Sequence, residues 1–369
     1  MQEIIITLIA TIILDFLIQT LIFKVKYSQT PLKIKTFDSD QPYHPSVMYS
    51  ANGWNGFQYW MVLTPYPMQK APYKDRWECP CIYCSTDGIN WNPPIGFQNP
   101  LDDLTDKEIE HKDFFSDPHL VFRKNRLECW YRISHHHHND RDTYLIRKYS
   151  QDGIHWSERE ILYNPQSPED VNKLGDMVRS PAILYINKAY HMWYVDNKHN
   201  VGQRNLCYTS SIDGKQWEQR INCQLTGKSI NPWHIDVTYI DGLYRLTVYD
   251  LYELTLWDSP DGIHFQYKQT LLKPSLIYGN FYSDGLYRSV LLKDGNTYTC
   301  YFSAFDDKRT YIGIMRGKTL FQLKVISCQD SHYKLKQLII IYLKNRKRTL
   351  SLLKSKLLKY LNKRLSYQL

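Results

Sequence analysis

A seven-residue signature occurs four times along the chain and constrains the fold more than any other feature of the sequence. Each copy reads Ser-x-Asp-Gly-x-x-aromatic, and the copies begin at Ser85, Ser150, Ser211 and Ser259. Successive copies lie 48 to 65 residues apart, a spacing that indicates an array of similar supersecondary units. Asp-Gly between strand-like runs predicts a tight turn, because Gly tolerates positive φ and the Asp side chain caps the turn backbone. We expect a folding element without chemistry of its own.

Short runs rich in aromatic and β-branched residues precede each copy of the signature. In the first block these runs are residues 59–63 and 81–84, and in the second they are 119–122, 127–131 and 144–149. Such runs, bounded by Gly, Asn, Asp or Pro, are typical of β-strands. Four strands in each repeat are the blade of a β-propeller. The signature should then lie between outer strands, away from the central channel.

A fifth block lacks the signature and contains only three strand-like runs, at 287–292, 298–302 and 311–315. We expect residues 32–37 to supply its fourth strand, because closing the ring removes exposed sheet edges. The predicted fold class is all-β, with a five-bladed β-propeller domain at residues 28–330. The 30 Tyr and 10 Trp residues suit a sheet-rich protein with a carbohydrate-type surface.

Residues 1–27 are predicted to form a hydrophobic membrane-anchor helix. Residues 4–23 are nearly all apolar, and about 20 such residues cross a bilayer. Asp15 and Gln19 weaken this prediction, and a helix lying on the membrane surface is the alternative. No basic stretch precedes the run and no small-residue cleavage site follows it, so the sequence argues against a signal peptide. Lysines follow the run, so the positive-inside rule predicts a propeller on the cytoplasmic side.

Residues 331–369 are predicted to form a basic amphipathic helical tail. They contain eleven Lys or Arg residues and no Asp or Glu, so the net charge of +9 arises from this segment. Leucines recur at helical spacing from Leu350 to Leu365, which favours an anionic membrane surface as partner. Nucleic acid is the competing partner, but nothing else in the sequence resembles a nucleic-acid module.

The eight cysteines and the run of four histidines are weak metal signals. Most cysteines lie in predicted strands, where thiols behave as small apolar groups, and they should be reduced in the cytoplasm. Cys79, Cys81 and Cys84 lack a second ligand pair, and the histidines at 135–138 lie in a polar loop. We expect no functional metal at either place.

Polar or charged residues stand at the start of the first strand of every block, and those strands should line the propeller axis. The openings are His44-Pro-Ser, Ser116-Asp117-Pro118-His119, Arg179-Ser-Pro, His234-Ile-Asp236 and Tyr287-Arg288. One such residue would be a strand cap, but five at the same place predict a site at the channel entrance.

With these openings the chain resembles the five-bladed propeller superfamily of glycoside hydrolases. The families are the arabinanases and xylosidases, the invertases and levansucrases, and the mannoside phosphorylases. The resemblance covers residues 40–318 and rests on blade number and on Ser116-Asp117-Pro118. It implies carboxylates that act at the starts of inner strands, here Asp117 and Asp236, with Glu128 as a third candidate or a structural partner for an Arg. In some relatives calcium occupies the channel, so a divalent ion is a further implication.

The chain departs from that pattern in blades one and three. His44 stands where those enzymes usually have an Asp, and Arg179-Ser180-Pro181 stands where a general-acid Glu is expected. Glu78-Cys79-Pro80 is similar to the invertase acid motif, but its place in blade one argues against a role.

The remaining candidate residues are basic or aromatic. The basic ones suit an anionic group such as phosphate and are His44, His119, Arg179, His234 and Arg288. Trp54 and Tyr66 are either a platform for a sugar ring or ordinary packing residues.

The sequence therefore predicts a carbohydrate-active enzyme that cleaves or transfers a glycosidic bond. Its substrate would be a glycan or a phosphorylated sugar, in surface-polysaccharide metabolism. The alternative is a non-catalytic, membrane-tethered glycan-binding propeller, which the missing carboxylates of blades one and three support. A protein-interaction scaffold explains the fold but not the charged pocket.

Overall fold

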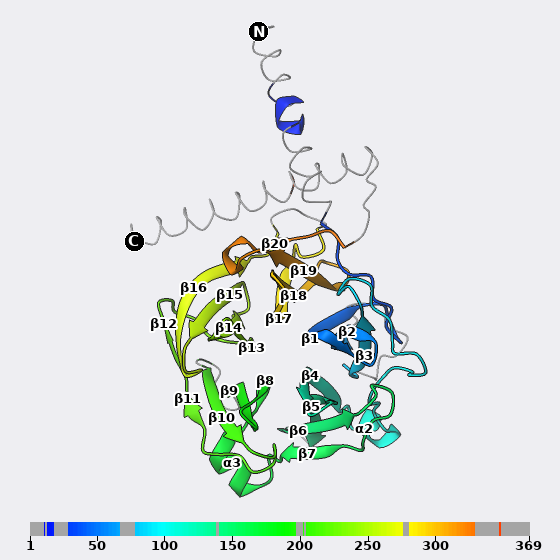
Figure 1. The fold of residues 1–369 in the computed structure, drawn as a ribbon, viewed down its shortest axis with the longest axis vertical. Helices are drawn as coiled ribbons and strands as arrows, with labels where there is room; N and C mark the ends of the chain where they lie inside the picture. Colours follow the sequence, from blue (N-terminus) through cyan, green and yellow to red (C-terminus); the bar gives the residue numbers. More distant parts are fainter. Residues whose placement is uncertain are drawn as a thin grey trace, which may run out of the picture.

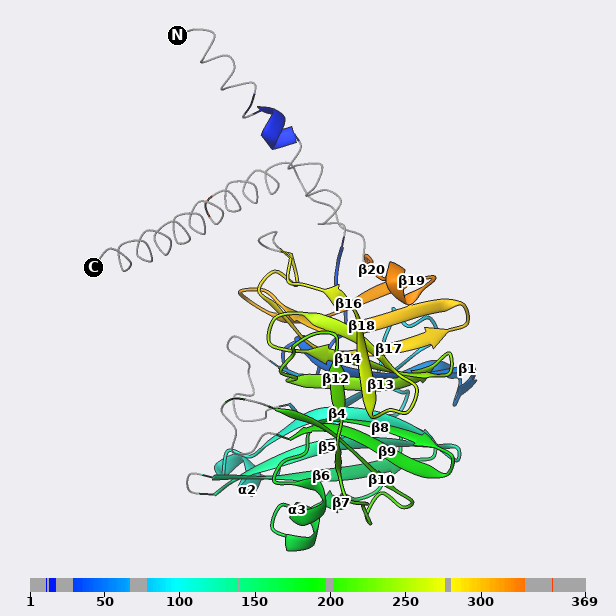
Figure 2. The same ribbon diagram turned by 90° about the vertical axis from the view of Figure 1, so that its left-hand side faces the viewer.

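The protein is a five-bladed β-propeller, as the repeats predicted. The computed structural model describes residues 11, 13–17, 29–66, 78–137, 140–196, 202, 204–275, 280–328 and 347. Five sheets surround a common axis in Figure 1, and Figure 2 shows the same ring from the side. The first strands of the five blades contact one another around that axis; they are β1, β4, β8, β13 and β17.

The strands of each blade follow one another from the axis outwards in chain order, except that β12 pairs in parallel with the outer edge of blade four. Blade one contains β1 (Pro42–Trp54), β2 (Phe57–Pro65) and β3 (Cys81–Ser85). Blade two contains β4 (Phe114–Arg123), β5 (Arg126–His137), β6 (Asp140–Ser150) and β7 (Glu160–Tyr163). Blade three contains β8 (Arg179–Ile186), β9 (Ala189–Asp196), β10 (Asn205–Ser211) and β11 (Ile221–Asn222).

Blades four and five complete the ring. Blade four contains β12 (Gln224–Thr226), β13 (His234–Ile240), β14 (Leu243–Tyr249), β15 (Leu254–Ser259) and β16 (His264–Leu272). Blade five contains β17 (Gly285–Asp294), β18 (Thr297–Phe305), β19 (Thr310–Gly317) and β20 (Lys324–Val325). The short helical elements are α2 (Asp106–Glu110), α3 (Pro168–Leu174) and η1 (Leu320–Gln322). Helices α2 and α3 lie at the outer rim (Figure 1).

The hydrophobic core consists of five clusters, each between two neighbouring blades. Between blades one and two, for example, Trp60 and Val62 pack with Leu127 and Tyr131. Apolar area buried between sheets contributes about 25 cal/mol per Å², so contacts between blades, rather than one central core, stabilise the ring.

The predicted fourth strand of blade five at residues 32–37 is wrong. Strand β20 pairs with β19 at the outer edge of that blade instead. The N-terminal segment lies beside the same strand without strand geometry: the Leu32 N–H donates to the Ile312 carbonyl over 2.8 Å, and Leu32 and Ile34 are buried against blade five. Two segments therefore share one edge, and only the C-terminal segment pairs as a strand.

The signature loops follow the third strand of blades one to four and join each blade to the preceding one. In the second copy the Asp152 carboxylate accepts the N–H groups of Ile154 and His155 over 2.8 Å each. Gly153 has a φ of 79° and lies against the ring of Trp60 in blade one. Corresponding contacts join Gly88 to Tyr301, Gly214 to Trp130 and Gly262 to Trp193. The structural role predicted for the signature is confirmed.

Replacing Gly153 with Ala should destabilise the protein by about 2–5 kcal/mol, since positive φ and overpacking each contribute a few kcal/mol. The added Cβ would lie 2.3 Å from Trp60. The matched control is Gly56→Ala, where φ is 85° but nothing lies within 4 Å of the added Cβ. Urea unfolding of both variants measures the difference, and equal losses would contradict docking between blades.

The two predicted terminal helices fall almost entirely outside the described residues. Within the described part of the chain, no helix has the length and apolar character required to cross a membrane.

Candidate functional site

A backbone irregularity common to four inner strands builds the site. Strands β1, β4, β8 and β17 each contain a register shift at the same point near their start, between Tyr43/Ser46, Ser116/His119, Arg179/Ala182 and Leu286/Ser289. In the first three blades the bulged residue has φ near 50°; these residues are His44, Asp117 and Ser180. Each is followed by Pro, which has no N–H to leave unpaired at the bulge. The bulges bring the three residues together at the axis.

Asp117 is a buried carboxylate held by three neighbours. Its Oδ2 lies 2.9 Å from Arg132 Nη2 and accepts the Ser180 backbone N–H over 2.9 Å. Its Oδ1 lies 3.3 Å from His234 Nδ1. Burial alone would raise the pKa of Asp117, but the positive charge of Arg132 and the other basic neighbours hold it well below its usual range. Asp117 is therefore ionised.

His234 and Arg288 have buried nitrogen atoms directed into the same region. Burial lowers the pKa of His234 well below its usual value although Asp117 opposes the shift, so the imidazole is neutral. Neither of its ring nitrogens makes a hydrogen bond with the described residues, and its ring packs 4.1 Å from that of Tyr287. Arg288 donates from Nη2 to the Pro181 carbonyl over 2.9 Å, whereas its Nε and Nη1 have no partner among the described atoms. These groups are available to a ligand.

His44 belongs to a second polar cluster near His234. His44 Nδ1 lies 2.7 Å from Thr64 Oγ1 and 3.0 Å from Glu78 Oε2, while Nε2 has no hydrogen-bond partner within the described structure. The His44 and His234 rings are 5.9 Å apart. Glu78 lies three residues before β3 in blade one, and its side chain reaches His44, so its place in blade one does not keep it away from this cluster.

The other entrance residues predicted from sequence separate into different surroundings. Tyr66 lies 6.1 Å from the His44 ring and stays a candidate for sugar contact. Trp54 is only 8% exposed and packs in the core between blades one and two, so the sugar-platform interpretation is wrong for this residue. Ser180, not Arg179, takes the bulged position of blade three, and the Arg179 guanidinium stacks on Trp233 at 4.4 Å.

Glu128 lies in a network of hydrogen bonds between blades two and three. It is fully buried and contacts Arg126, Trp130 and Tyr190. Of the two interpretations of Glu128, these contacts favour the structural one.

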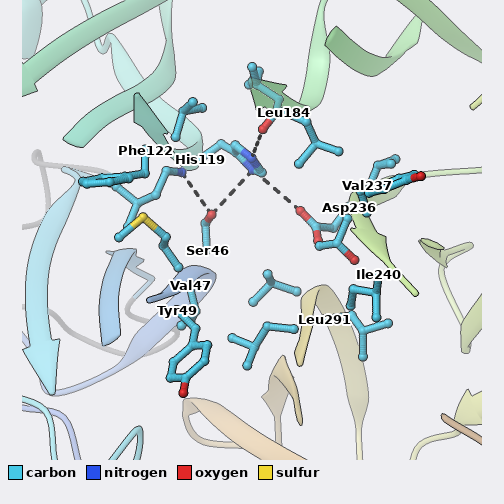
Figure 3. A pocket seen from close by; sticks show the side chains of 18 of the residues that line it. Ser46, Val47, Tyr49, His119, Phe122, Leu184, Asp236, Val237, Ile240 and Leu291 are labelled. Atoms are coloured by element: carbon cyan, nitrogen blue, oxygen red, sulfur yellow. Dashed lines mark hydrogen bonds and ion pairs between the residues drawn. The ribbon is translucent and has the colours of Figure 1, made fainter. Parts of the chain in front are cut away.

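His119 follows Asp117 by two residues in β4, and Asp236 follows His234 by two residues in β13. The two side chains lie near each other in a deeper layer of the channel (Figure 3). His119 Nε2 donates to the Ile183 carbonyl over 2.9 Å, so Nδ1 carries the lone pair. Burial and the charge of Arg288 lower the pKa of His119 to about 3. Burial raises the pKa of Asp236 to about 7, although Arg288 opposes the shift. Because His119 and His234 are neutral, an anionic substrate group would depend on the arginines.

The raised pKa of Asp236 predicts that the stability of the protein depends on pH. A carboxyl whose pKa is raised on folding stabilises the protein fully only below its unfolded pKa of about 3.9, and this contribution is lost as pH rises through the folded value. The folded value is about 7, so the free energy of unfolding should fall between these limits. The Asp236→Asn variant should lack this fall. Urea unfolding of both proteins at pH 5 and pH 8 measures it, and parallel profiles would contradict the assignment.

Metal binding receives no support from the described side chains. Among them, no group of three or more His, Cys, Asp or Glu residues is arranged to hold a metal ion. The eight cysteines are free thiols. A divalent ion in the channel stays a prediction.

Sequence reasoning missed two groups of the site besides Ser180. Arg132 ends up beside Asp117 from the second strand of its blade, and Thr64 reaches His44 in the same way. No local pattern marks such residues. The bulges did leave a signal, the X-Pro pairs at 44–45, 117–118 and 180–181.

Comparison with known proteins finds similarity to carbohydrate-processing enzymes. No protein-family model matches it. An A type blood N-acetyl-α-D-galactosamine deacetylase of Flavonifractor plautii is 25% identical over 285 residues, which cover 65% of this chain and 36% of the relative. The chain therefore spans about a third of the length of that curated relative.

Solved structures show the same fold. An N-acetylgalactosamine deacetylase from F. plautii, in complex with blood group B trisaccharide, superposes with a TM-score of 0.63 at 21% identity, over 78% of this chain and 93% of that one. A glycoside hydrolase superposes with a TM-score of 0.57 at 10% identity, over 86% and 97%. The predicted architectural likeness to glycan-acting propellers is confirmed.

Proposed function

We propose that this propeller is a glycan-acting hydrolase that removes the N-acetyl group from an amino sugar. The observation that carries the proposal is the 25% identity to a deacetylase over 285 residues.

Hydrolysis of an amide requires a base for the attacking water and donors for the negative charge that develops on the carbonyl oxygen. His44 is the best base, because Glu78 and Thr64 lie near its Nδ1, whereas its Nε2 makes no hydrogen bond with the described residues. A His oriented through one nitrogen by a carboxylate accepts a proton at the other. The unpartnered N–H groups of Arg288 suit the carbonyl oxygen.

Asp117 is too acidic to act as the base. Its negative charge lies 3.3 Å from His234 Nδ1 and favours one orientation of that ring. It is thus a positioning residue whose loss should misplace both His234 and substrate.

Cleavage of the glycosidic bond is the second candidate reaction. Two carboxyl groups with pKa values shifted apart are typical of glycosidases, and Asp117 and Asp236 differ in this way. Both share Arg288 as a charged neighbour. Asp236, however, lies in the deeper layer with His119.

Mass spectrometry of treated oligosaccharides distinguishes the candidates. The full chain is incubated with oligosaccharides ending in N-acetylgalactosamine or N-acetylglucosamine, and with phosphorylated and neutral sugars lacking an acetyl group. Acetate release with the oligosaccharide otherwise intact supports the proposal, and the His44→Gln variant should abolish it. Shortened oligosaccharides would establish glycosidic cleavage, and binding without turnover would establish a glycan-binding propeller.

Membrane attachment, a cytoplasmic propeller and a role in surface-polysaccharide metabolism remain proposals based on the terminal sequences. Fractionation of cells expressing the full chain, with and without residues 1–27, tests the anchor.

A further inference from the structure

The inner strands enclose a cavity that the proposed reaction does not use. Its volume is about 580 Å³, and it is lined by later residues of the same five strands, including Ser46, His119, Ile183, Asp236 and Leu291. The bulged residues His44 and Asp117 do not line it. Its lining residues come later in the inner strands than the entrance residues do, so it lies beyond the entrance site along these strands. Figure 3 shows side chains that line it.

The walls of this cavity are apolar, whereas its floor is polar. The walls contain aliphatic and aromatic side chains, among them Val47, Tyr49, Phe122, Leu184, Val237, Ile240 and Leu291. Asp241 and Lys293 also line the cavity and form an ion pair of 2.6 Å with each other. A glycan would find few hydrogen-bond partners along such walls, but an apolar body would be well accommodated.

The floor has one acceptor with only long contacts, His119 Nδ1, and one carboxyl group, Asp236, that lacks a well-formed hydrogen bond to the described residues. His119 Nδ1 carries a lone pair, since Nε2 donates to Ile183. Ser46 Oγ and Asp236 Oδ1 lie 3.5 Å and 3.6 Å from that nitrogen, too far for strong hydrogen bonds. Asp236 is 2% exposed; the Leu291 backbone N–H lies near its carboxyl group, but neither carboxyl oxygen makes a hydrogen bond of normal geometry with the described residues. Buried polar atoms of this kind are normally satisfied.

Charge at the floor selects the head group of a ligand. Arg288 Nη2 lies 3.4 Å from His119 Nδ1, and its positive charge also acts on Asp236. A second cation would be repelled by Arg288, and an anion would face the His119 lone pair and Asp236. A hydroxyl group suits both partners. When Asp236 is protonated, the hydroxyl donates to His119 and accepts from Asp236. When Asp236 is ionised, the hydroxyl donates to the carboxylate.

We propose that this cavity binds a neutral small molecule with an apolar body and a hydroxyl head, the hydroxyl resting on His119 and Asp236. The proposal is independent of the reaction at the channel entrance.

A matched series of probes tests the head group: cyclohexylmethanol, cyclohexylmethylamine and cyclohexanecarboxylate. Binding to the full chain is measured by titration calorimetry and saturation-transfer NMR. The alcohol should bind roughly tenfold or more tightly than the other two, the equivalent of one or two good hydrogen bonds. Equal or tighter binding of the amine or the carboxylate would overturn the proposal.

Two variants test the place of binding. Leu184→Trp fills the cavity from a partly buried wall position, and Asp236→Leu removes the carboxyl group. Each should weaken alcohol binding roughly tenfold. Ile95→Trp is the control, because Ile95 is 88% exposed and does not line the cavity. Alcohol binding that persists in a folded Leu184→Trp variant would refute the assignment.

Discussion

The Asp117→Asn variant is expected to lose at least about a hundredfold in kcat/KM for acetyl release, the scale of an oriented acid–base group. Asn keeps the size of Asp117 and still accepts the Ser180 N–H, but it lacks the charge that faces Arg132 and His234. His234 would then lose its orienting partner. Initial rates of acetate release measure the effect.

Loss of stability has to be separated from loss of catalysis in this variant, because a buried Arg132 without its carboxylate destabilises the fold. The control is Asp196→Asn, which removes the carboxylate partner of Arg220 in blade three. Rates are compared at a temperature at which both variants are folded by circular dichroism. A similar rate loss in Asp196→Asn would show that the effect is not specific to the site.

The Glu128→Ala variant is expected to lose about 3–5 kcal/mol of stability, the usual cost of leaving a buried ion pair without one partner. The Glu128 carboxylate accepts the Tyr190 hydroxyl over 2.8 Å and the Trp130 indole N–H over 3.0 Å. Arg126 and the buried Arg147 lie within ion-pair distance of it. Tyr190 belongs to blade three, so the substitution removes a contact between blades. Urea unfolding monitored by Trp fluorescence measures the change.

The conservative Glu128→Gln variant distinguishes a structural from a catalytic residue. Gln keeps the shape and part of the hydrogen bonding, and Arg147 retains its ion pair with Glu160. A structural Glu128 predicts a smaller stability loss and nearly normal acetate release. Near-complete loss of activity in a stable Glu128→Gln protein would instead assign it to catalysis.

Much of the architecture could be predicted because it repeats. The signature marks the end of the third strand in four blades, and each block places its first strand on the axis. The closure of blade five was predicted wrongly because two terminal segments compete for the edge of β19. Residues 32–37 resemble a strand in sequence, but residues 324–325 form the strand that pairs with β19, while Leu32 makes a backbone hydrogen bond to Ile312 beside it.

The candidate site was predictable only in part. His44, Asp117 and His234 lie at strand openings, and alignment of the blocks finds such positions. Arg132 and Glu78 come from later parts of the same blades, and their contacts depend on tertiary structure that no spacing encodes. The apolar surroundings of Trp54 likewise depend on how blades one and two face each other.

The bulges at the start of the inner strands separate the choice of reactive group from the folding of the sheets. The register shifts in β1, β4 and β8 leave the side chain at the bulge outside the strand pairing, and a Pro follows it in each blade. An imidazole, a carboxylate and a hydroxyl thus occupy equivalent places in three blades, at His44, Asp117 and Ser180. In a scaffold of this kind, one amino-acid substitution at a bulged position can change the reactive group at the axis, while the hydrophobic clusters between neighbouring blades stay unchanged.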